Sequence, residues 1–181
     1  MDAGRHIEKW FFQYERDITN YLVYYTGSRD VEDIVQDTFL RALLAFPRFR
    51  NDADPKTWLI SIARNTAIDS FRRKSLWQKL KQSLNSSQNE PESSADKNLL
   101  QKEEQLELHL AINRLKENYR DVVLLRGIAE LSAAETARVL GWSTNKVNVT
   151  FHRAVQKLNT LLKEGAMDVR PNRKTASSKA E

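Results

Sequence analysis

The residues whose types and spacing most clearly suggest a chemical role lie between positions 132 and 162. Ser132 and Glu135 have the spacing of a capping box at a helix start, Gly141 permits a tight turn, and a second helix follows from Thr144. Apolar side chains recur on one face of that second helix, at Val147, Phe151, Ala154, Val155, Leu158, Leu161 and Leu162. This pattern predicts a helix-turn-helix over residues 133–162 whose second helix docks in the major groove of DNA.

The opposite face of the second helix carries uncharged polar and basic side chains. Amides and small side chains read base edges, whereas cations hold phosphates. The residues expected to contact DNA are Thr144, Asn145, Lys146, Asn148, Val149, His152 and Arg153. The alternative is a solvated amphipathic helix within a bundle, and His152 alone would not decide, because a solvated surface histidine is the commoner case.

A helix expected over residues 30–46 has two contrasting faces. Val31, Val35 and Phe39 belong to its predicted core face, whereas Asp33, Asp37, Leu40 and Leu44 lie on the opposite side. Carboxylates beside exposed leucines indicate a docking site for a basic, partly apolar partner. The alternative is that a neighbouring helix covers the leucines and the acids are merely solvated. We call the set of Asp33, Asp37, Leu40 and Leu44 the acid–leucine face.

A third helix is expected to begin near Thr57, with Trp58, Leu59, Ile62, Ala63 and Thr66 buried. Its other side carries a stripe made of Ser61, Arg64, Asn65, Ile68 and Arg72 and continued by Arg73 and Lys74. The cations suit a nucleic-acid backbone, and the amide of Asn65 suits hydrogen bonds to bases. Phe49 lies beside this stripe in sequence and could stack on an unpaired base, although a core position is the commoner role of such a phenylalanine.

The elements that position these residues all have helical period, so the predicted fold class is all-α. Residues 83–96 are almost free of apolar side chains, which predicts a flexible linker over 76–102 between domains at 1–75 and 103–165 and a disordered tail at 166–181. The chain has no cysteine, a net charge of +5 and no apolar run of membrane-spanning length. We therefore expect no disulfide, no zinc finger and a soluble intracellular protein.

Four segments together resemble a known family: DVEDIVQDTFLRAL, FPRFR, TWLISIARNTAIDSFRRK and FHRAVQKL. In their order and spacing, over residues 7–163, they are similar to extracytoplasmic-function (group 4) sigma factors of the sigma-70 family of bacterial RNA polymerase. The resemblance implies a region 2 helical bundle, a linker and a region 4 helix-turn-helix. It also implies a promoter-specificity factor that binds core polymerase, recognises the −35 and −10 elements and melts DNA to start transcription of stress- or envelope-related genes.

By this resemblance, particular residues acquire expected partners. Those expected to bind the clamp helices of the polymerase β′ subunit are Asp33, Gln36, Asp37, Leu40 and Leu44. Those expected to hold the unpaired −10 element, with one base extruded into a pocket, are Phe49, Arg50, Asn51, Asp52, Lys56, Ser61, Arg64, Asn65 and Arg72. The seven residues of the second helix would read the −35 element, and their domain would contact the β-flap.

The resemblance further implies an anti-sigma factor as a partner and a cytoplasmic protein, nucleoid-associated on polymerase and held at the membrane when an anti-sigma factor retains it. It implies no catalytic residue, metal, cofactor, small-molecule substrate or membrane insertion. The recognition helix departs from the family pattern Gly-Thr-Val-Lys-Ser-Arg-Leu, because Asn148 and Thr150 stand where two cations are usual. Fewer phosphate contacts predict a shallower salt dependence for this domain.

Two other classes of function compete with this interpretation. The first is a two-domain transcriptional regulator that is not part of polymerase, which would need neither the acid–leucine face nor the stripe beside Phe49. The second is an enzyme acting on nucleic acid. The sequence has no phosphate-binding glycine loop and no cysteine, and its histidines at 6, 109 and 152 lie far apart, so no catalytic or metal site is indicated.

Overall fold

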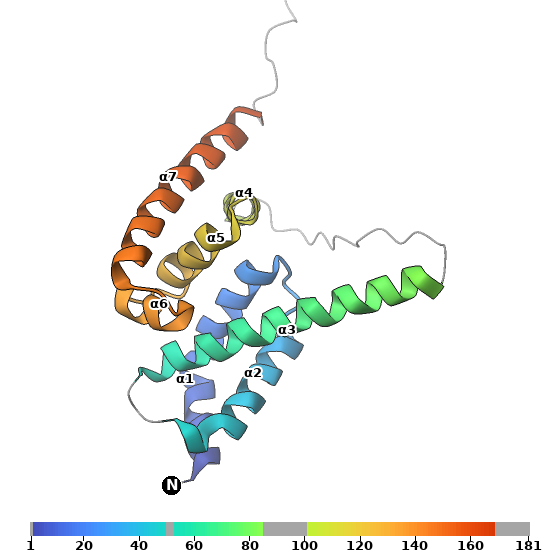
Figure 1. The fold of residues 1–181 in the computed structure, drawn as a ribbon, viewed down its shortest axis with the longest axis vertical. Coiled ribbons are helices and arrows are strands. Elements are labelled where there is room, and N and C mark those ends of the chain that lie inside the picture. Colours follow the sequence, from blue (N-terminus) through green and yellow to red (C-terminus); the bar gives the residue numbers. More distant parts are fainter. Residues whose placement is uncertain (1, 50–52, 85–100, 169–181) are drawn as a thin grey trace, which may run out of the picture.

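The computed structural model describes residues 2–49, 53–84 and 101–168, and every regular element within these residues is a helix (Figure 1). The elements in chain order are α1 (Ala3–Thr26), α2 (Glu32–Ala45), η1 (Phe46–Arg48), α3 (Pro55–Leu84), α4 (Gln101–Asn113), α5 (Glu117–Val123), η2 (Leu124–Ile128), α6 (Ala133–Leu140) and α7 (Thr144–Asp168). The all-α class expected from the sequence is confirmed.

The first domain is built from α1, α2 and α3, with α3 lying across the other two (Figure 1). Local signals set its helix ends. The α1 helix stops at Gly27, which has φ +79°, and α3 starts at Pro55 after Asp54, whose Oδ1 accepts the backbone N–H of Lys56 at 2.9 Å. The largest fully buried side chains of this domain are those of Tyr21, Ile18, Leu22, Leu59 and Ile60.

The second domain contains the predicted helix-turn-helix, formed by α6 and α7. The capping box is present: Ser132 Oγ accepts the N–H of Glu135 at 3.2 Å, and Glu135 Oε2 accepts the N–H of Ser132 at 2.7 Å. Gly141 ends α6 in the left-handed region at φ +67°, which a residue with a Cβ would adopt only with strain. A small cluster of Val122, Ala137 and Val147 packs under the turn and joins α5, α6 and α7.

The two domains lie against one another and share one buried core. Ile18, Leu22 and Ile60 of the first domain belong to the same apolar cluster as Ile112 and Leu124 of the second. The α6 helix rests over the N-terminal part of α3, and η2 lies against α1 (Figure 1). Residues of the first domain that the sequence pattern leaves on an outer face are therefore covered by the second domain.

The helices extend into the segment that the sequence predicts to be a linker. The α3 helix continues to Leu84, so residues 76–84 are helical, and α4 begins at Gln101. Helix propagation adds one hydrogen bond for each residue fixed, and Leu76, Trp77 and their neighbours are acceptable helix formers. Residues 85–100 of the predicted linker lie outside the described residues, as do residues 169–181 of the predicted tail, whose first residues belong to α7.

Candidate polymerase-docking and DNA-binding surfaces

The acid–leucine face is an open surface of α2. Leu40 and Leu44 have exposed fractions of 56% and 74%, and Asp33 is exposed as well. No helix among the described residues covers the two leucines, which is the outcome expected of a docking surface. Leu43 lies one helical turn after the core residue Phe39, but it is also exposed and enlarges this apolar surface. Gln36 is exposed beside it and donates to Glu32 Oε1 at 3.3 Å.

Asp37 differs from Asp33 because it is already engaged within the molecule. Its Oδ2 lies 3.2 Å from Arg41 Nη2 and 3.9 Å from Arg73 Nη2, and Arg41 Nη1 also contacts Asp69 Oδ2 at 2.8 Å. The hydrogen bond from Arg41 lowers the pKa of Asp69, and the same bond raises the pKa of Arg41. This network ties α2 to α3, so Asp37 has a structural role in addition to any docking role.

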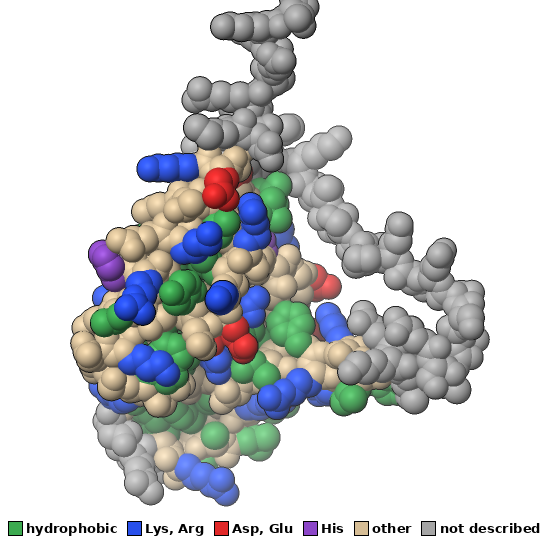
Figure 2. Space-filling view, turned by 45° about the horizontal axis from the view of Figure 1, so that its top comes forward, with side chains coloured by type: hydrophobic (Ala, Val, Ile, Leu, Met, Phe, Trp, Pro, Cys, Tyr) green, Lys and Arg blue, Asp and Glu red, His purple; other side chains and the backbone are tan. Residues whose placement is uncertain are grey.

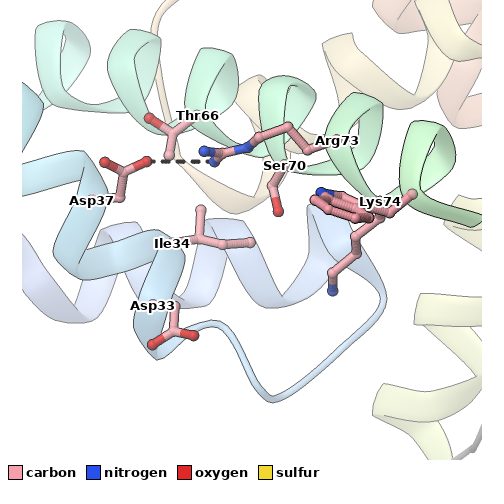
Figure 3. Close-up of a pocket in the computed structure, with 8 residues that line it drawn as sticks. Asp33, Ile34, Asp37, Thr66, Ser70, Arg73 and Lys74 are labelled. Carbon is pink, nitrogen blue, oxygen red and sulfur yellow. Dashed lines mark ion pairs between the residues drawn. The ribbon is translucent and has the colours of Figure 1, made fainter. Parts of the chain in front are cut away.

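A cleft of about 330 Å³ lies beside this network, between α2 and α3 (Figure 3). In Figure 3, Asp37 and Arg73 point toward one another across the cleft, whereas Asp33 points away from the pair. The cleft is lined by Asp33, Ile34, Asp37, Thr66, Ser70, Arg73, Lys74 and Trp77. The cleft carries charges of both signs and lies beside the exposed indole of Trp77. Its lining comes from both helices, so the cleft continues the acid–leucine face from α2 onto α3.

Two aromatic residues of α1 also belong to this side of the first domain. Phe12 is 80% exposed, and the neighbouring Phe11 packs edge-on against Phe39 of α2 with ring centroids 4.9 Å apart. Phe12 is therefore a docking candidate. Helical periodicity in α1 alone does not reveal it, because the helix against which α1 packs is not known from the sequence.

Phe49 lies within an aromatic cluster and is half-buried. Its ring centroid is 4.8 Å from that of Trp58, 5.2 Å from that of Trp10 and 6.2 Å from that of Phe46. This is the packing role that competed with base stacking in the sequence analysis. A base could stack on Phe49 in this arrangement only on the part of the ring that these aromatics leave open.

The other candidate −10 residues fall into three groups. Asn65 and Arg72 are exposed on α3 and open to a ligand. Lys56 Nζ contacts Asp17 Oδ2 of α1 at 2.8 Å, and Ser61 Oγ donates to the carbonyl oxygen of Trp58 at 2.6 Å, so both have partners inside the domain. Three further candidates lie outside the described residues, namely Arg50, Asn51 and Asp52.

Arg64 forms a buried ion pair with the second domain. Its Nη2 donates to Asp121 Oδ2 of α5 at 2.6 Å, and the two side chains are only 18% and 4% exposed. Burial alone would lower the pKa of Arg64, but the hydrogen bond and the charge of Asp121 outweigh it and raise that pKa. In this arrangement the guanidinium of Arg64 is paired with a carboxylate of the same chain.

The surroundings of this pair are polar and incompletely satisfied. Tyr21 is fully buried next to it, and burial raises the pKa of its hydroxyl well above the ordinary value. The Tyr21 hydroxyl, Asp121 Oδ1 and Arg64 Nε have no protein hydrogen-bond partner within the described part of the chain. Buried polar groups without partners are costly, so separation of the domains would return hydration to these atoms.

A second polar contact joins the domains at the start of α3. Thr57 Oγ1 donates to Glu135 Oε1 at 2.9 Å. Glu135 is the capping-box residue of α6, and hydrogen bonds from Ser132, followed by that from Thr57, lower its pKa. Asp121 and Glu135 thus connect the two domains, a role that no local sequence pattern indicates because their partners lie 57 and 78 residues away.

The candidate −35 residues are all exposed. The side chains of Thr144, Asn145, Lys146, Asn148, Val149, His152 and Arg153 lie on the outer face of α7. Val147 and Ala154 are fully buried on the inner face, as the predicted periodicity requires. In Figure 2, Lys and Arg side chains are spread over this face of the second domain with few acidic ones between them. The face is therefore available to duplex DNA while the domains are in contact.

Two further observations limit the chemistry of the described residues. Within residues 2–49, 53–84 and 101–168, no group of three or more His, Asp or Glu side chains could hold a metal ion. No helix in these ranges is long and apolar enough to cross a bilayer. What the described surfaces offer is binding: an apolar, acidic face on one domain and a polar, basic face on the other.

Comparisons with known proteins agree with the two-domain arrangement. The family model for Sigma-70 region 2 matches residues 10–76, and that for Sigma-70, region 4 matches residues 105–158. The chain is 37% identical over 154 residues to the RNA polymerase sigma factor YlaC of Bacillus subtilis, a match covering 82% of this chain and 87% of the relative. It is 34% identical over 175 residues to the ECF RNA polymerase sigma factor SigX of the same organism, covering 90% and 89%.

A solved structure has the same fold. The sigma factor RpoE from Bartonella quintana, determined in complex with the anti-sigma factor NepR, superposes with a TM-score of 0.70 at 20% sequence identity. The superposition covers 88% of this chain and 98% of the other chain. At this level of identity the likeness concerns the path of the helices.

Proposed function

This chain belongs to the sigma-70 family of RNA polymerase sigma factors, in its extracytoplasmic-function group, and on this premise we propose which of its surfaces bind polymerase and which bind promoter DNA. As a sigma factor it directs core polymerase to promoters. A two-domain regulator outside polymerase is not favoured by these relationships. We further propose that the chain catalyses no reaction of its own and acts in the cytoplasm.

The proposed polymerase surface is the acid–leucine face, with Gln36 of the same helix and Phe12 of α1. The exposure of Leu40 and Leu44 on α2, and of Phe12 on α1, supports this assignment, because large exposed apolar side chains mark sites of protein–protein contact when they form a patch. Asp33, which forms no ion pair with another described residue, supplies a carboxylate for basic residues of the partner. The second domain would contact the β-flap, and an anti-sigma factor would compete for these surfaces.

The proposed −35 surface is the outer face of α7, and the exposure of all seven candidate residues on it is the observation that carries the DNA-binding assignment. Asn145, Asn148 and His152 present hydrogen-bonding groups to base edges, and Arg153 presents a cation to the backbone. The proposed −10 surface comprises Phe49, the segment 50–56 and Asn65, with Ser61, Arg64 and Arg72 at its edge. An aromatic, an amide and a cationic rim suit unpaired bases.

The two surfaces cannot be used together while the domains are in contact. The −10 and −35 elements are separated by on the order of 80 Å of duplex, at about 3.4 Å per base pair. Thr57 and Glu135 are hydrogen-bonded at 2.9 Å, so the domain of α3 touches the domain of α7. We therefore propose that promoter binding requires separation of the domains, which also frees Arg64 from Asp121 for the −10 region.

The experiment that tests the proposed function is run-off transcription with purified core polymerase and the full chain on genomic fragments, followed by start-site mapping. We expect transcripts that depend on the chain and start downstream of a shared pair of −35 and −10 sequences. Core polymerase without the chain is the control. Absence of chain-dependent starts, with the chain bound to core polymerase, would contradict the assignment of promoter recognition to these surfaces.

A further inference from the structure

The first nine residues of α7 contain one cation. From Thr144 to His152, Lys146 is the only lysine or arginine, and the next is Arg153. The side chain of Lys146 is exposed, and no carboxylate of the described residues forms an ion pair with it. A cation in the first turn of a helix is electrostatically unfavourable, because the free N–H groups there are themselves positive. A specific interaction is therefore needed to explain where its ammonium lies.

That interaction is with Trp142. Lys146 Nζ lies 3.9 Å from the centroid of the Trp142 ring, well inside the roughly 6 Å range of cation–π attraction, and tryptophan is the most effective partner. The contact is with the face of the indole, so it uses no N–H group as a hydrogen-bond donor. The ammonium is held in place and still has donors for a second ligand.

Trp142 is itself fixed by the turn between α6 and α7. Gly141 adopts φ +67°, which brings the backbone N–H of Trp142 to the carbonyl oxygen of Ala137 at 2.9 Å. The half-buried indole packs against the cluster of Val122, Ala137 and Val147. A flexible lysine thus contacts a rigid support that belongs to the helix-turn-helix.

A second cation–π contact in the same domain shows what a purely internal role looks like. Arg126 lies over the Phe151 ring at 5.2 Å, and its Nη1 donates to the carbonyl oxygen of Leu131 at 2.7 Å. Arg126 is half-buried, and its bond to Leu131 ties η2 to the segment before α6. Lys146 has no such internal acceptor among the described residues, and it lies on the exposed face of α7.

We propose that Trp142 is a positioning residue that holds the Lys146 ammonium ready for a backbone phosphate at the −35 element. The inference rests on the proposed assignment of the α7 outer face to −35 DNA. Lysine is a flexible point charge, and ordering it on binding costs side-chain entropy. An ammonium held before binding avoids part of that cost. Because a phosphate contact carries no sequence information, the pair raises affinity for all −35 sequences alike.

The test uses polymerase holoenzyme reconstituted with full-length variants and a duplex promoter fragment identified by start-site mapping. Lys146→Met keeps the aliphatic stem and removes the charge, and it should lower the slope of log affinity against log salt by about one unit. Trp142→Leu should lower affinity about two- to fivefold with a smaller change in slope, because the charge remains but is no longer held. Trp142→Tyr keeps an aromatic face and should restore most of the affinity.

The double variant separates positioning from a merely structural role. In a Lys146→Met background, Trp142→Leu should have no further effect on DNA affinity. Equal losses in both backgrounds, or failure of Trp142→Tyr to restore affinity, would overturn the proposal. Thermal unfolding of each variant shows whether Trp142→Leu is stably folded. If it is not, Lys146→Met still tests the phosphate contact, because this substitution does not disturb the packed indole. Lys163→Met, an exposed cation farther along α7, is the matched control and should leave affinity unchanged.

The same measurements distinguish failure of this proposal from failure of the proposed function. If Lys146→Met leaves affinity and salt slope unchanged while Asn148→Ala and His152→Ala weaken binding, the support by Trp142 is wrong and the −35 surface stands. If none of these three substitutions affects binding, the assignment of the α7 face to −35 DNA is itself wrong.

Discussion

The two domains differ in how far their candidate DNA-binding residues are already paired within the chain. On α7 of the second domain, every candidate −35 residue is exposed, from Thr144 to Arg153. On α3 of the first domain, Arg64 is paired with Asp121 and Lys56 is paired with Asp17. Arg64 must lose Asp121 before it can bind DNA, so any contribution of Arg64 to affinity at the −10 surface includes the free energy of separating the domains.

The two surfaces differ because α3 takes part in the contact between the domains and the outer face of α7 does not. The outer face of α7 is exposed, whereas the N-terminal half of α3 takes part in the contact with the second domain, where Arg64 meets Asp121 of α5 and Thr57 meets Glu135 of α6. The contact contains a buried ion pair and several unsatisfied polar atoms. Such pairs contribute little net stability when intact and cost much when one partner is removed. This asymmetry leads to the first prediction.

Removing one partner of the ion pair should have the largest effect. Asp121→Ala leaves the Arg64 guanidinium buried without a counter-charge, and we expect the contact between the domains to be destabilised by about 3 to 5 kcal/mol. The domains should separate, which small-angle X-ray scattering would detect as an increased radius of gyration. Binding of a single-stranded −10 oligonucleotide to the free chain should increase, because Arg64 becomes accessible.

Glu117→Ala is the matched control, since Glu117 is an exposed acid at the start of α5 in the same domain. It should change neither scattering nor oligonucleotide binding. Unchanged scattering of Asp121→Ala would mean that the Arg64–Asp121 pair does not hold the domains together.

The next effect concerns polymerase binding by the first domain. Asp37→Lys should weaken the affinity for core polymerase by about 3 kcal/mol, because an attractive charge becomes a repulsive one at the interface. Asp33→Lys should be equally damaging to core binding but less so to stability, because Asp33 lies outside the network of Asp37, Arg41 and Arg73. Fluorescence anisotropy with labelled chain measures the affinity, and circular dichroism checks helicity. Wild-type affinity in a helical Asp37→Lys variant would exclude this face as the docking site.

A smaller effect should distinguish the two DNA-binding surfaces, because one acts in duplex binding and the other in promoter opening. Asn148→Ala or His152→Ala should weaken holoenzyme binding to closed duplex promoter by about 1 to 3 kcal/mol for a direct base contact. Asn65→Ala should leave duplex binding intact and impair opening, a defect that a pre-melted −10 template only partly relieves. Permanganate footprinting on duplex and pre-melted templates checks both. If the Asn65→Ala variant opened promoters normally and kept its −10 preference, the assignment of base recognition to α3 would be wrong.

The smallest expected effect is a pH dependence of the domain contact at His109 of α4. Its ring lies against Tyr24 and Gly27 at the end of α1, its Nε2 accepts a hydrogen bond from Asn113 at 2.8 Å, and burial lowers its pKa. Because the pKa of His109 is lowered in the folded protein, neutral His109 stabilises the contact between the domains fully above the ordinary histidine pKa of about 6.5. This stabilisation decreases as the pH falls through the folded-state pKa. Acidification below about pH 6.5 should therefore favour separation modestly, as measured by scattering.

His109→Gln should remove this dependence, whereas His152→Gln, at an exposed histidine, should keep it. A pH profile unaffected by His109→Gln would show that another group is responsible.

Local sequence patterns predicted the helix-turn-helix of the second domain and the exposed leucines of α2. The capping box at Ser132 and Glu135, the left-handed Gly141 and the buried positions of α7 follow from side-chain chemistry within a few residues, and all are present in the structure. The exposure of Leu40 and Leu44 follows in the same way from helical period. The end of α3 did not follow, because low apolar content in residues 83–96 says little about how far a helix propagates before them.

By itself the sequence therefore determined that this chain is an all-α, two-domain protein of the sigma-70 family, because periodicity, caps and motifs are local properties. Only the tertiary structure decided that Arg64 meets Asp121 and that Thr57 meets Glu135. These partners are 57 and 78 residues apart, and the sequence places Arg64 on the outer stripe of its own helix. Which outer faces meet depends on how whole domains pack together, and no pattern within one helix encodes that choice.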